Sequence, residues 1–239
     1  MELTLDKVPL RIDALFFATV LGVLALAVLA VRVAVQRAGQ AQAADLWTMR
    51  AAMGAMLWLV ATGLVALSDA LRGFSLSLFT ALMILTGGAA FSRVGTALVA
   101  AIGPVGLIGF QFFRVPVAVF LRGMYQAGQV PVQMTYVGLN FDIFAGLTAP
   151  AMAWLVWRGK VGSYAIWTWN ALGLMLLAEA IVIAVLSMPT EFRVFTNEPA
   201  STFATYAPYV WLPTVLAPAA LLGHLLVFRW LSSSCPGSR

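Results

Sequence analysis

Seven long runs of apolar residues, separated by short polar segments, set the pattern of the chain. They cover residues 14–35, 46–67, 74–91, 94–125, 140–157, 163–188 and 208–231. A helix needs about 20 apolar residues to cross the hydrocarbon core of a bilayer, and each run has roughly that length or more. The pattern therefore predicts an all-α fold: a polytopic transmembrane bundle of about seven helices that forms one domain over residues 1–239.

The fourth run, 94–125, is the least regular of the seven. Glycine recurs at every third position from Gly103, beside Pro104, and the stretch 110–125 that follows is amphipathic. Gln111, Arg114 and Arg122 share one stripe of that stretch, opposite a stripe of phenylalanine and aliphatic residues. Either this stripe faces a polar cavity, or the two arginines extend to the headgroups at the outer interface. The sequence leaves open whether 110–125 spans the membrane or lies along its surface.

The composition excludes a soluble protein. Apolar residues make up 62% of the chain, charged residues 10%, and the mean hydropathy is +0.94. A soluble domain is about half apolar and about a quarter charged, so lipid must cover the excess apolar surface here. The net charge of +5 comes from basic residues spread singly or in pairs, mostly near the ends of apolar runs. A nucleic-acid partner would require a basic patch, so we expect the lipid bilayer and no nucleic acid as partner.

The placement of basic residues predicts the orientation, because cytoplasmic loops carry more Lys and Arg than external ones. With seven crossings, six basic residues fall on the N-terminal side: Lys7, Arg11, Arg72, Arg114, Arg122 and Arg193. Eight fall on the other side: Arg32, Arg37, Arg50, Arg93, Arg158, Lys160, Arg229 and Arg239. We therefore expect the N-terminus outside and the C-terminus in the cytoplasm. Arginine strongly outnumbers lysine, which is typical of GC-rich bacterial genomes and points to a bacterial inner membrane.

No motif of an enzyme or of a cofactor site occurs in the chain. A nucleophile elbow, a paired-histidine zinc motif, a phosphate-binding loop and a dinucleotide fingerprint are all absent. His224 is the only histidine and Cys235 the only cysteine, too few for a zinc site or a bis-histidine haem site. We expect no catalytic residue, metal or cofactor, and an enzymatic function is the least favoured.

Glu179 is the most conspicuous ionisable residue, because it lies deep in the run 163–188. It is nine residues from Met188, or about 13 Å along a helix, too far for its short side chain to reach the headgroups. Such a group is paired, protonated or exposed to water, and ionisable groups at this depth are default functional candidates. The alternative is a neutral carboxyl group that is hydrogen-bonded to a neighbouring helix.

Arg114 and Asp142 are expected at a similar depth, near the outer face. Asp142 or Asn140 can cap the helix that begins at residue 140. Capping would explain the presence of these two polar residues without a binding role. The functional alternative is an outward-facing polar pocket lined by Gln111, Arg114, Asn140, Asp142 and Glu179 that binds a small molecule or an ion. His224, about seven residues from the end of the last run, is either a packing residue or linked to proton movement.

Three functions remain open. The first is transport or binding of a small molecule or ion through this pocket in the outer half. The second is a non-catalytic accessory or structural subunit of a membrane complex, which requires a membrane protein partner. The third is a seven-helix sensory or receptor-like protein that acts through a partner.

Overall fold

The computed structural model describes residues 8–68 and 70–234, which form helices, turns and loops without a strand. The α-helices are α1 (Leu10–Arg37), α2 (Ala44–Leu67), α3 (Ala70–Phe91), α4 (Arg93–Phe110), α5 (Arg114–Gln126), α6 (Ile143–Trp157), α7 (Ser163–Leu186) and α8 (Ala217–Ser234). Four short 3-10 segments are η2 (Ala41–Ala43), η3 (Gln111–Phe113), η4 (Val132–Met134) and η5 (Phe203–Thr205). A π-helical turn, η6 (Leu212–Leu216), leads into α8. Lys7, Cys235 and Arg239 lie outside the described residues, as does the side chain of Arg72.

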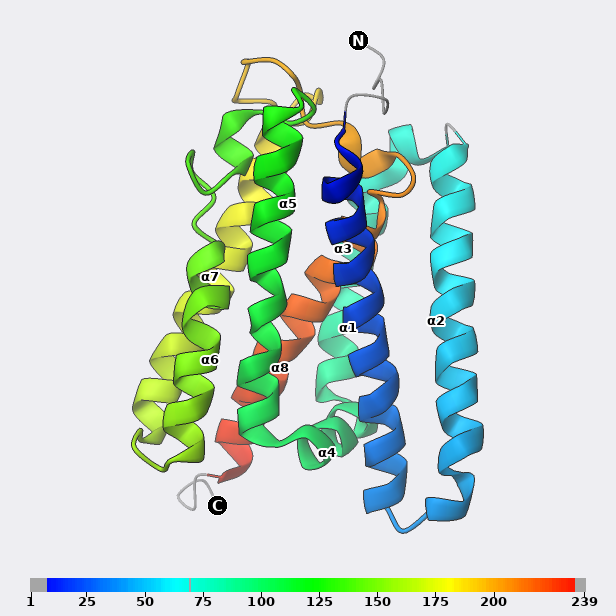
Figure 1. The fold of residues 1–239 in the computed structure, drawn as a ribbon, viewed down its shortest axis with the longest axis vertical. Helices are drawn as coiled ribbons and strands as arrows, with labels where there is room; N and C mark the ends of the chain where they lie inside the picture. The colour runs from blue at the N-terminus through cyan, green and yellow to red at the C-terminus, as the bar shows by residue number, and fades with distance from the viewer. Residues whose placement is uncertain (1–7, 69, 235–239) are drawn as a thin grey trace.

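Each predicted apolar run falls on a helix, and the all-helical prediction is confirmed for the described residues. Five helices there are long and apolar enough to cross a membrane, and two more, in 76–91 and 143–157, are shorter apolar helices. Most helices run along the length of the molecule (Figure 1). We call the end at which α1 begins the upper end and the end at which α8 finishes the lower end, as they lie in that view.

The fourth predicted run is two helical pieces rather than one. Gly103 has φ 71° and ψ 169°, which breaks the helix, and Pro104 opens the piece that follows. Proline favours the first position of a helix because its missing N–H needs no partner there. The piece before Gly103 lies across the lower end, and the piece after it continues through η3 into α5 along the bundle (Figure 1). The stretch 110–125 therefore runs lengthwise inside the fold.

Two arginines hold the lower end together. Nη1 of Arg37, at the end of α1, donates to the backbone oxygen of Ala100 at 2.7 Å. Nη1 of Arg229 in α8 donates to the backbone oxygen of Ala90 in α3 at 2.7 Å. The first bond satisfies a carbonyl group beside the break in α4, and the second satisfies one near the end of α3, both places where a helix leaves backbone acceptors free.

Two apolar clusters divide the core into an upper and a lower half. The upper cluster gathers aromatic residues of α1, α5 and the segment before α8: Phe16, Phe120, Phe203 and Tyr209. The lower cluster joins α4, α6, α7 and α8 through Leu107, Ile108, Ala153, Ile166, Leu226 and Val227. Between the two clusters, α5, α7 and α8 each carry buried polar residues. The core is therefore layered: apolar, polar, apolar.

Tryptophan side chains connect the peripheral helix α2 to the start of α8. Pro218 has no N–H, so it cannot donate to the carbonyl of Thr214 four residues earlier. The indole Nε1 of Trp58 in α2 donates to that carbonyl at 3.1 Å, and Nε1 of Trp211 donates to the carbonyl of Leu59 at 3.2 Å. A carbonyl group without a hydrogen-bond donor is unfavourable in lipid, so these two hydrogen bonds stabilise the irregular start of α8.

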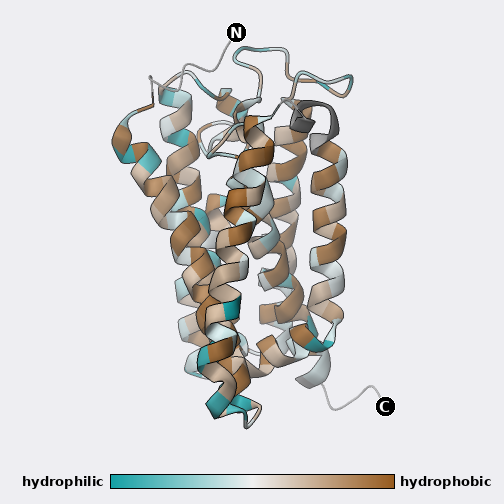
Figure 2. Cartoon of the chain, turned by 90° about the vertical axis from the view of Figure 1, so that its right-hand side faces the viewer, coloured by the Kyte–Doolittle hydropathy of each residue, from teal (hydrophilic) through white to brown (hydrophobic). Residues whose placement is uncertain are grey.

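The outer surface is largely apolar. Figure 2 shows hydrophobic residues along the helices, with hydrophilic residues concentrated toward the two ends. Met53 and Leu57 in α2 are 63% and 70% exposed, and Met175 in α7 is 65% exposed. Such a belt of exposed apolar side chains is typical of a bundle whose sides face lipid.

The break at Gly103 leads to a testable prediction. Its backbone lies in a region that only glycine adopts readily, so Gly103→Ala is expected to destabilise the fold by about 1–3 kcal/mol. A Cβ at this position would meet no atom within 4 Å, so any loss reports backbone strain alone. Unfolding in mixed micelles measures it. The matched control is Gly54→Ala inside α2, also free of contacts, which is expected to be neutral or stabilising. Equal behaviour of the two variants would contradict the strained break.

Candidate functional site

Arg114 points into the bundle, and only 2% of it is exposed. Its guanidinium meets the Asp142 carboxylate through two nitrogens: Nε donates to Oδ2 at 2.8 Å and Nη2 donates to Oδ1. Nη1 donates to Nε2 of His224 at 2.8 Å, and Nη2 also donates to the backbone oxygen of Gly173 at 3.1 Å. Arg114 therefore faces the interior of the bundle rather than the headgroups at the outer interface. Arg122 instead packs over the ring of Tyr125, 5.1 Å from its centroid.

The hydrogen bonds define the state of His224. An arginine only donates, so Nε2 of His224 must accept, and a neutral imidazole then carries its proton on Nδ1. That Nδ1–H donates to Oδ1 of Asn170 at 2.8 Å. Nδ2 of Asn170 donates in turn to the backbone oxygen of His224 at 3.0 Å. The donors therefore run in one direction from Arg114 through His224 to Asn170, and His224 is a neutral imidazole.

Glycines make room for this network. A Cβ on Gly173 in α7 would lie 2.6 Å from Cε1 of His224. A Cβ on Gly223 in α8 would lie 2.4 Å from Nε2 of Gln111, and one on Gly146 in α6 would lie 2.9 Å from Cγ2 of Val115. Each distance is too short for a real contact, so α6, α7 and α8 approach the polar layer only because these positions lack side chains.

Asp142 occupies the N-cap position of α6, but its side chain makes no capping hydrogen bond. Its carboxylate is directed to Arg114 instead, and its side chain is 14% exposed. Oδ1 of Asn140 accepts from the backbone N–H of Asp142 at 3.1 Å, and Nδ2 of Asn140 donates to the carbonyl of Met134 at 3.0 Å. Asn140 thus orders the loop that presents Asp142. Capping alone does not explain Asp142.

Arg114 and Asp142 form a charge-balanced pair inside an apolar fold. Removing one partner of a buried pair leaves an uncompensated charge, which is why such pairs are kept together. His224 and Asn170, each fully buried, add neutral hydrogen-bonding groups and no charge. No group of three or more His, Cys, Asp or Glu side chains suited to a metal ion occurs among the described residues.

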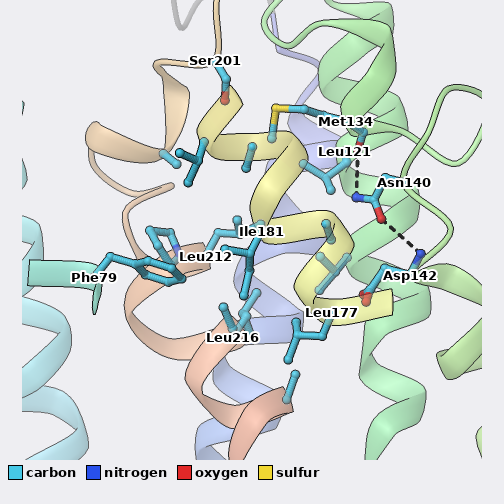
Figure 3. Close-up of a pocket in the computed structure, with 18 of the residues that line it drawn as sticks. Phe79, Leu121, Met134, Asn140, Asp142, Leu177, Ile181, Ser201, Leu212 and Leu216 are labelled. Carbon is cyan, nitrogen blue, oxygen red and sulfur yellow. Dashed lines mark hydrogen bonds between the residues drawn. The ribbon is translucent and has the colours of Figure 1, made fainter. Parts of the chain in front are cut away.

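A cavity of about 160 Å³ lies above the polar layer. Residues from α3, η3, α5, η4, α7, η5, η6 and α8 line it, and most of them are apolar. Its polar groups are few: Arg114, Asn140 and Asp142 on one side, and Ser201 and Thr205 elsewhere in the wall. Figure 3 shows Asn140 and Asp142 on the side opposite Phe79, with Leu177, Ile181, Leu212 and Leu216 between them and Ser201 above.

A second hollow lies outside the bundle between α1 and α2. Phe17, Leu21, Met56, Leu64 and Trp211 are among the residues that line it. No charged residue lines this groove, in contrast to the first cavity. It has the character of a surface that lipid chains cover.

Gln111 belongs to the polar layer but does not line the cavity. It is fully buried, and its Nε2 donates to the backbone oxygen of Ala220 at 3.2 Å. Its Oε1 is buried and has no hydrogen-bond partner among the described residues. A buried acceptor without a partner is uncommon and typically marks a position for an internal water.

Glu179 lies apart from the other predicted site residues. The cavity is lined by Leu177, Ala180, Ile181 and Ala184 of α7 but not by Glu179. At about 100° per residue, Glu179 points some 200° away from Leu177, on the flank that carries the exposed Met175. Its Oε2 is buried without a hydrogen-bond partner in the described part of the chain. The expected shared pocket therefore unites Arg114, Asn140 and Asp142 and leaves out Gln111 and Glu179.

Asn170 and Gly173 are the site residues that sequence reasoning missed. Asn170 is uncharged, so a search for ionisable groups passes over it, although an amide within the run 163–188 is itself unusual. Its spacing to Gly173 places the two residues on one face of α7, one turn apart. A buried amide beside a small residue at that spacing is the signal that could have found them.

The chain matches a known protein family. Residues 71–232, more than half of the chain, match the family described as "Domain of unknown function (DUF8737)". The matched region contains α4 to α7 and most of α3 and α8, and therefore all residues of the polar layer. No curated protein and no solved structure matches the chain.

The close approach of α7 and α8 predicts the effect of Gly173→Ala. The added methyl group would collide with the His224 ring, so the variant is expected to lose about 1–3 kcal/mol of stability. Thermal unfolding in detergent measures this. Gly88→Ala in α3 is the matched control, because its Cβ would meet nothing within 4 Å. If both variants unfold at the same temperature, His224 does not pack against Gly173 as described.

The pairing of Arg114 with Asp142 predicts strong coupling between them. Asp142→Ala is expected to cost about 3–5 kcal/mol in the wild type, because Arg114 keeps a buried charge without a partner. In an Arg114→Met background the same change is expected to cost about 2–3 kcal/mol less.

A double-mutant cycle of unfolding free energies measures this coupling. The exposed pair Arg32–Asp45, with side chains 40% and 85% exposed, serves as the control cycle and is expected to couple by less than about 1 kcal/mol. Additive effects at Arg114 and Asp142 would overturn the buried pair.

Proposed function

The chain belongs to the family of the domain of unknown function DUF8737, and we propose that it binds a small, mostly apolar molecule with a polar end in the cavity above Arg114. The observation that carries this proposal is the composition of the cavity wall. Apolar side chains cover most of the wall, while Arg114, Asn140 and Asp142 converge on one side. A mostly apolar pocket with a few convergent polar groups is the usual form of a small-molecule site.

The size and charge of the cavity further restrict which ligands fit. A dry cavity of about 150 Å³ holds a molecule the size of benzene, and this cavity has about 160 Å³. Asp142 already neutralises Arg114, so an ionised ligand would add an unbalanced charge in an apolar site. An uncharged head that donates and accepts hydrogen bonds, such as a hydroxyl or phenol, suits Asn140 and Asp142 best.

Binding is supported more directly than conduction. Below the cavity lie the polar layer and then the lower apolar cluster, whose Leu107, Ile108 and Leu226 are each no more than 2% exposed. A transporter would have to open this cluster to let the ligand pass, whereas a receptor would only have to bind the ligand in the cavity. We propose ligand binding as the common element, with transport or sensing as its use.

We further propose that the bundle crosses a bacterial inner membrane seven times, with the upper end outside and the lower end in the cytoplasm. In support, α1 begins and α8 finishes at opposite ends (Figure 1). Arg50 lies over the ring of Trp47 at 5.2 Å, and Arg158 lies over the ring of Trp154 at 5.7 Å. Tryptophan favours both headgroup layers, and an excess of basic residues favours the cytoplasmic one.

A cavity-filling variant tests the binding function. Ala184→Phe places a ring in the cavity, whereas Ala178→Phe adds the same ring to the exposed side of α7. The probe is 4-propylphenol, screened by thermal shift against the wild type and both variants. At about 100 times Kd, a ligand that binds only the folded state adds about 2.7 kcal/mol of stability. The wild type and Ala178→Phe are expected to show this shift and Ala184→Phe to lose it.

The alternatives give different results in the same assay. If no variant and no wild-type sample responds to the phenol or to related alcohols, and a membrane protein co-purifies, the accessory-subunit function replaces ligand binding. If Glu179→Gln, and not Ala184→Phe, abolishes the shift, the ligand binds on the other flank of α7. Either result would overturn the proposed cavity site.

A further inference from the structure

We infer that the ligand reaches this cavity sideways from the membrane, between α3 and α7, and is therefore a membrane-dissolved amphiphile with an uncharged head and an apolar tail. This inference rests on the proposed binding function. It adds the source of the ligand and its chemical class. The cavity has three possible ways out: upward, downward and sideways.

The upper way out is closed by the segment that follows α7 and includes η5, residues 187–205, which we call the strap. The backbone N–H of Ser201 donates to the oxygen of Ser187 at 2.8 Å. Nε2 of Gln133 donates to Oγ of Ser187 at 2.9 Å, and Nδ2 of Asn197 donates to Oε1 of Gln133 at 2.9 Å. Ser187, Ser201 and Gln133 are all buried. Opening the strap would therefore break their hydrogen bonds and leave several buried polar groups without partners.

The strap is also tied within itself. Nη2 of Arg193 donates to Oε1 of Glu198 at 2.9 Å and to the backbone oxygen of Asn197 at 3.1 Å. The hydrogen bond from Arg193 lowers the pKa of Glu198, and the backbone N–H of Ala200 helps in the same direction. The carboxylate thus stays ionised and keeps the turn that holds Asn197 near Gln133.

The lower way out is closed by the polar layer and by the lower apolar cluster. Arg114 has partners on α7, on α8 and in the loop before α6, so it connects three elements directly beneath the cavity. Beyond it, the side chains of the lower cluster fill the space between α4, α6, α7 and α8. A ligand passing this way would have to break the ion pair first.

The sideways route differs from both. Helix α3 packs against α8, η5 and η6, and α7 packs against α6, α8 and η4, so the two helices flank α8 rather than pack on each other. From α3, Leu76 and Phe79 reach the cavity wall. Figure 3 shows Phe79 directed from α3 toward Leu212 and Ile181, at the side opposite Asp142. We call this side of the cavity the seam.

Only apolar side chains close the seam. No hydrogen bond joins α3 to α7 among the described residues. Lipid tails are as apolar as leucine, so parting Phe79 from its aliphatic neighbours in a membrane exchanges one apolar contact for another. Opening the strap breaks buried hydrogen bonds, whereas opening the seam breaks none. The seam is therefore the easiest of the three routes.

This route determines the ligand. A molecule that enters past Phe79 meets Asn140 and Asp142 on the far side, so its polar head must enter first and its tail must point back to the seam. A tail longer than the cavity can then remain in the hydrocarbon. The inference predicts that tail length is not limited by the cavity volume, as it would be in a cavity filled from water through the strap.

The test uses 4-propylphenol and 4-dodecylphenol with the protein in lipid nanodiscs, compared at equal mole fraction in the membrane. Both probes are expected to bind. In a Cys235→Ser background, two pairs of cysteines are introduced and joined with a flexible bis-maleimide: Phe79→Cys with Ile181→Cys across the seam, and Gln133→Cys with Asn197→Cys across the strap. Joining the seam is expected to slow the association of 4-dodecylphenol by about tenfold, and joining the strap to leave it unchanged.

A variant without a cross-link tests the seam independently, because a cross-linked protein that is misfolded would also bind slowly. Phe79→Ala widens the seam and is expected to speed both association and dissociation of 4-dodecylphenol. The inference is overturned if short phenol binds and long phenol does not, or if the strap cross-link rather than the seam cross-link slows binding; the proposed binding function survives both results. Failure of the wild type to bind either phenol removes the binding function itself, and the sideways route with it.

Discussion

The fold depends on keeping one guanidinium inside an apolar bundle. Arg114 is almost completely buried, and its charge must be balanced where it lies. Asp142 supplies the balance from the start of α6, and the carbonyl of Gly173 and the imidazole of His224 accept its other N–H groups. Four parts of the chain must therefore meet at one depth. The glycines at 146, 173 and 223 are the consequence, because side chains there would hold the helices apart.

The polar layer also determines what the rest of the core can do. Apolar clusters above and below limit the access of water to the pair, which strengthens it, and the lower cluster fills the space beneath it. The cavity lies on the upper side of the layer, so a ligand there meets the outer edge of a charge-balanced network rather than a free ion. A small polar head can exchange hydrogen bonds with Asn140 and Asp142 without carrying a charge of its own. The same layering makes a sideways approach from lipid less costly than an approach through either end.

The sequence predicts the helices well because crossing lipid demands long apolar runs, and those runs are visible without any tertiary information. The break at Gly103 is harder to predict, because glycine and proline also occur inside transmembrane helices. Only the φ of +71° at Gly103 distinguishes a break from a kink. The sequence predicts a similar depth for Arg114 and Asp142, but not that the two side chains pair, because the order of the helices around the bundle is not visible in the sequence. The roles of Asn170 and Glu179 are harder to predict as well, because they depend on the rotation of α7 about its axis. Exposed apolar residues in lipid give that helix no clear amphipathic face, so only the spacing of Asn170 and Gly173 indicates which side is inward.

The most direct measurement is a crystal structure with 4-bromophenol, in which anomalous scattering places the bromine. We expect a bromine peak in the cavity between Phe79 and Asn140, with the phenol oxygen within hydrogen-bonding distance of Asn140 or Asp142. A peak confined to the outer groove between α1 and α2, with the cavity above Arg114 empty, would contradict it.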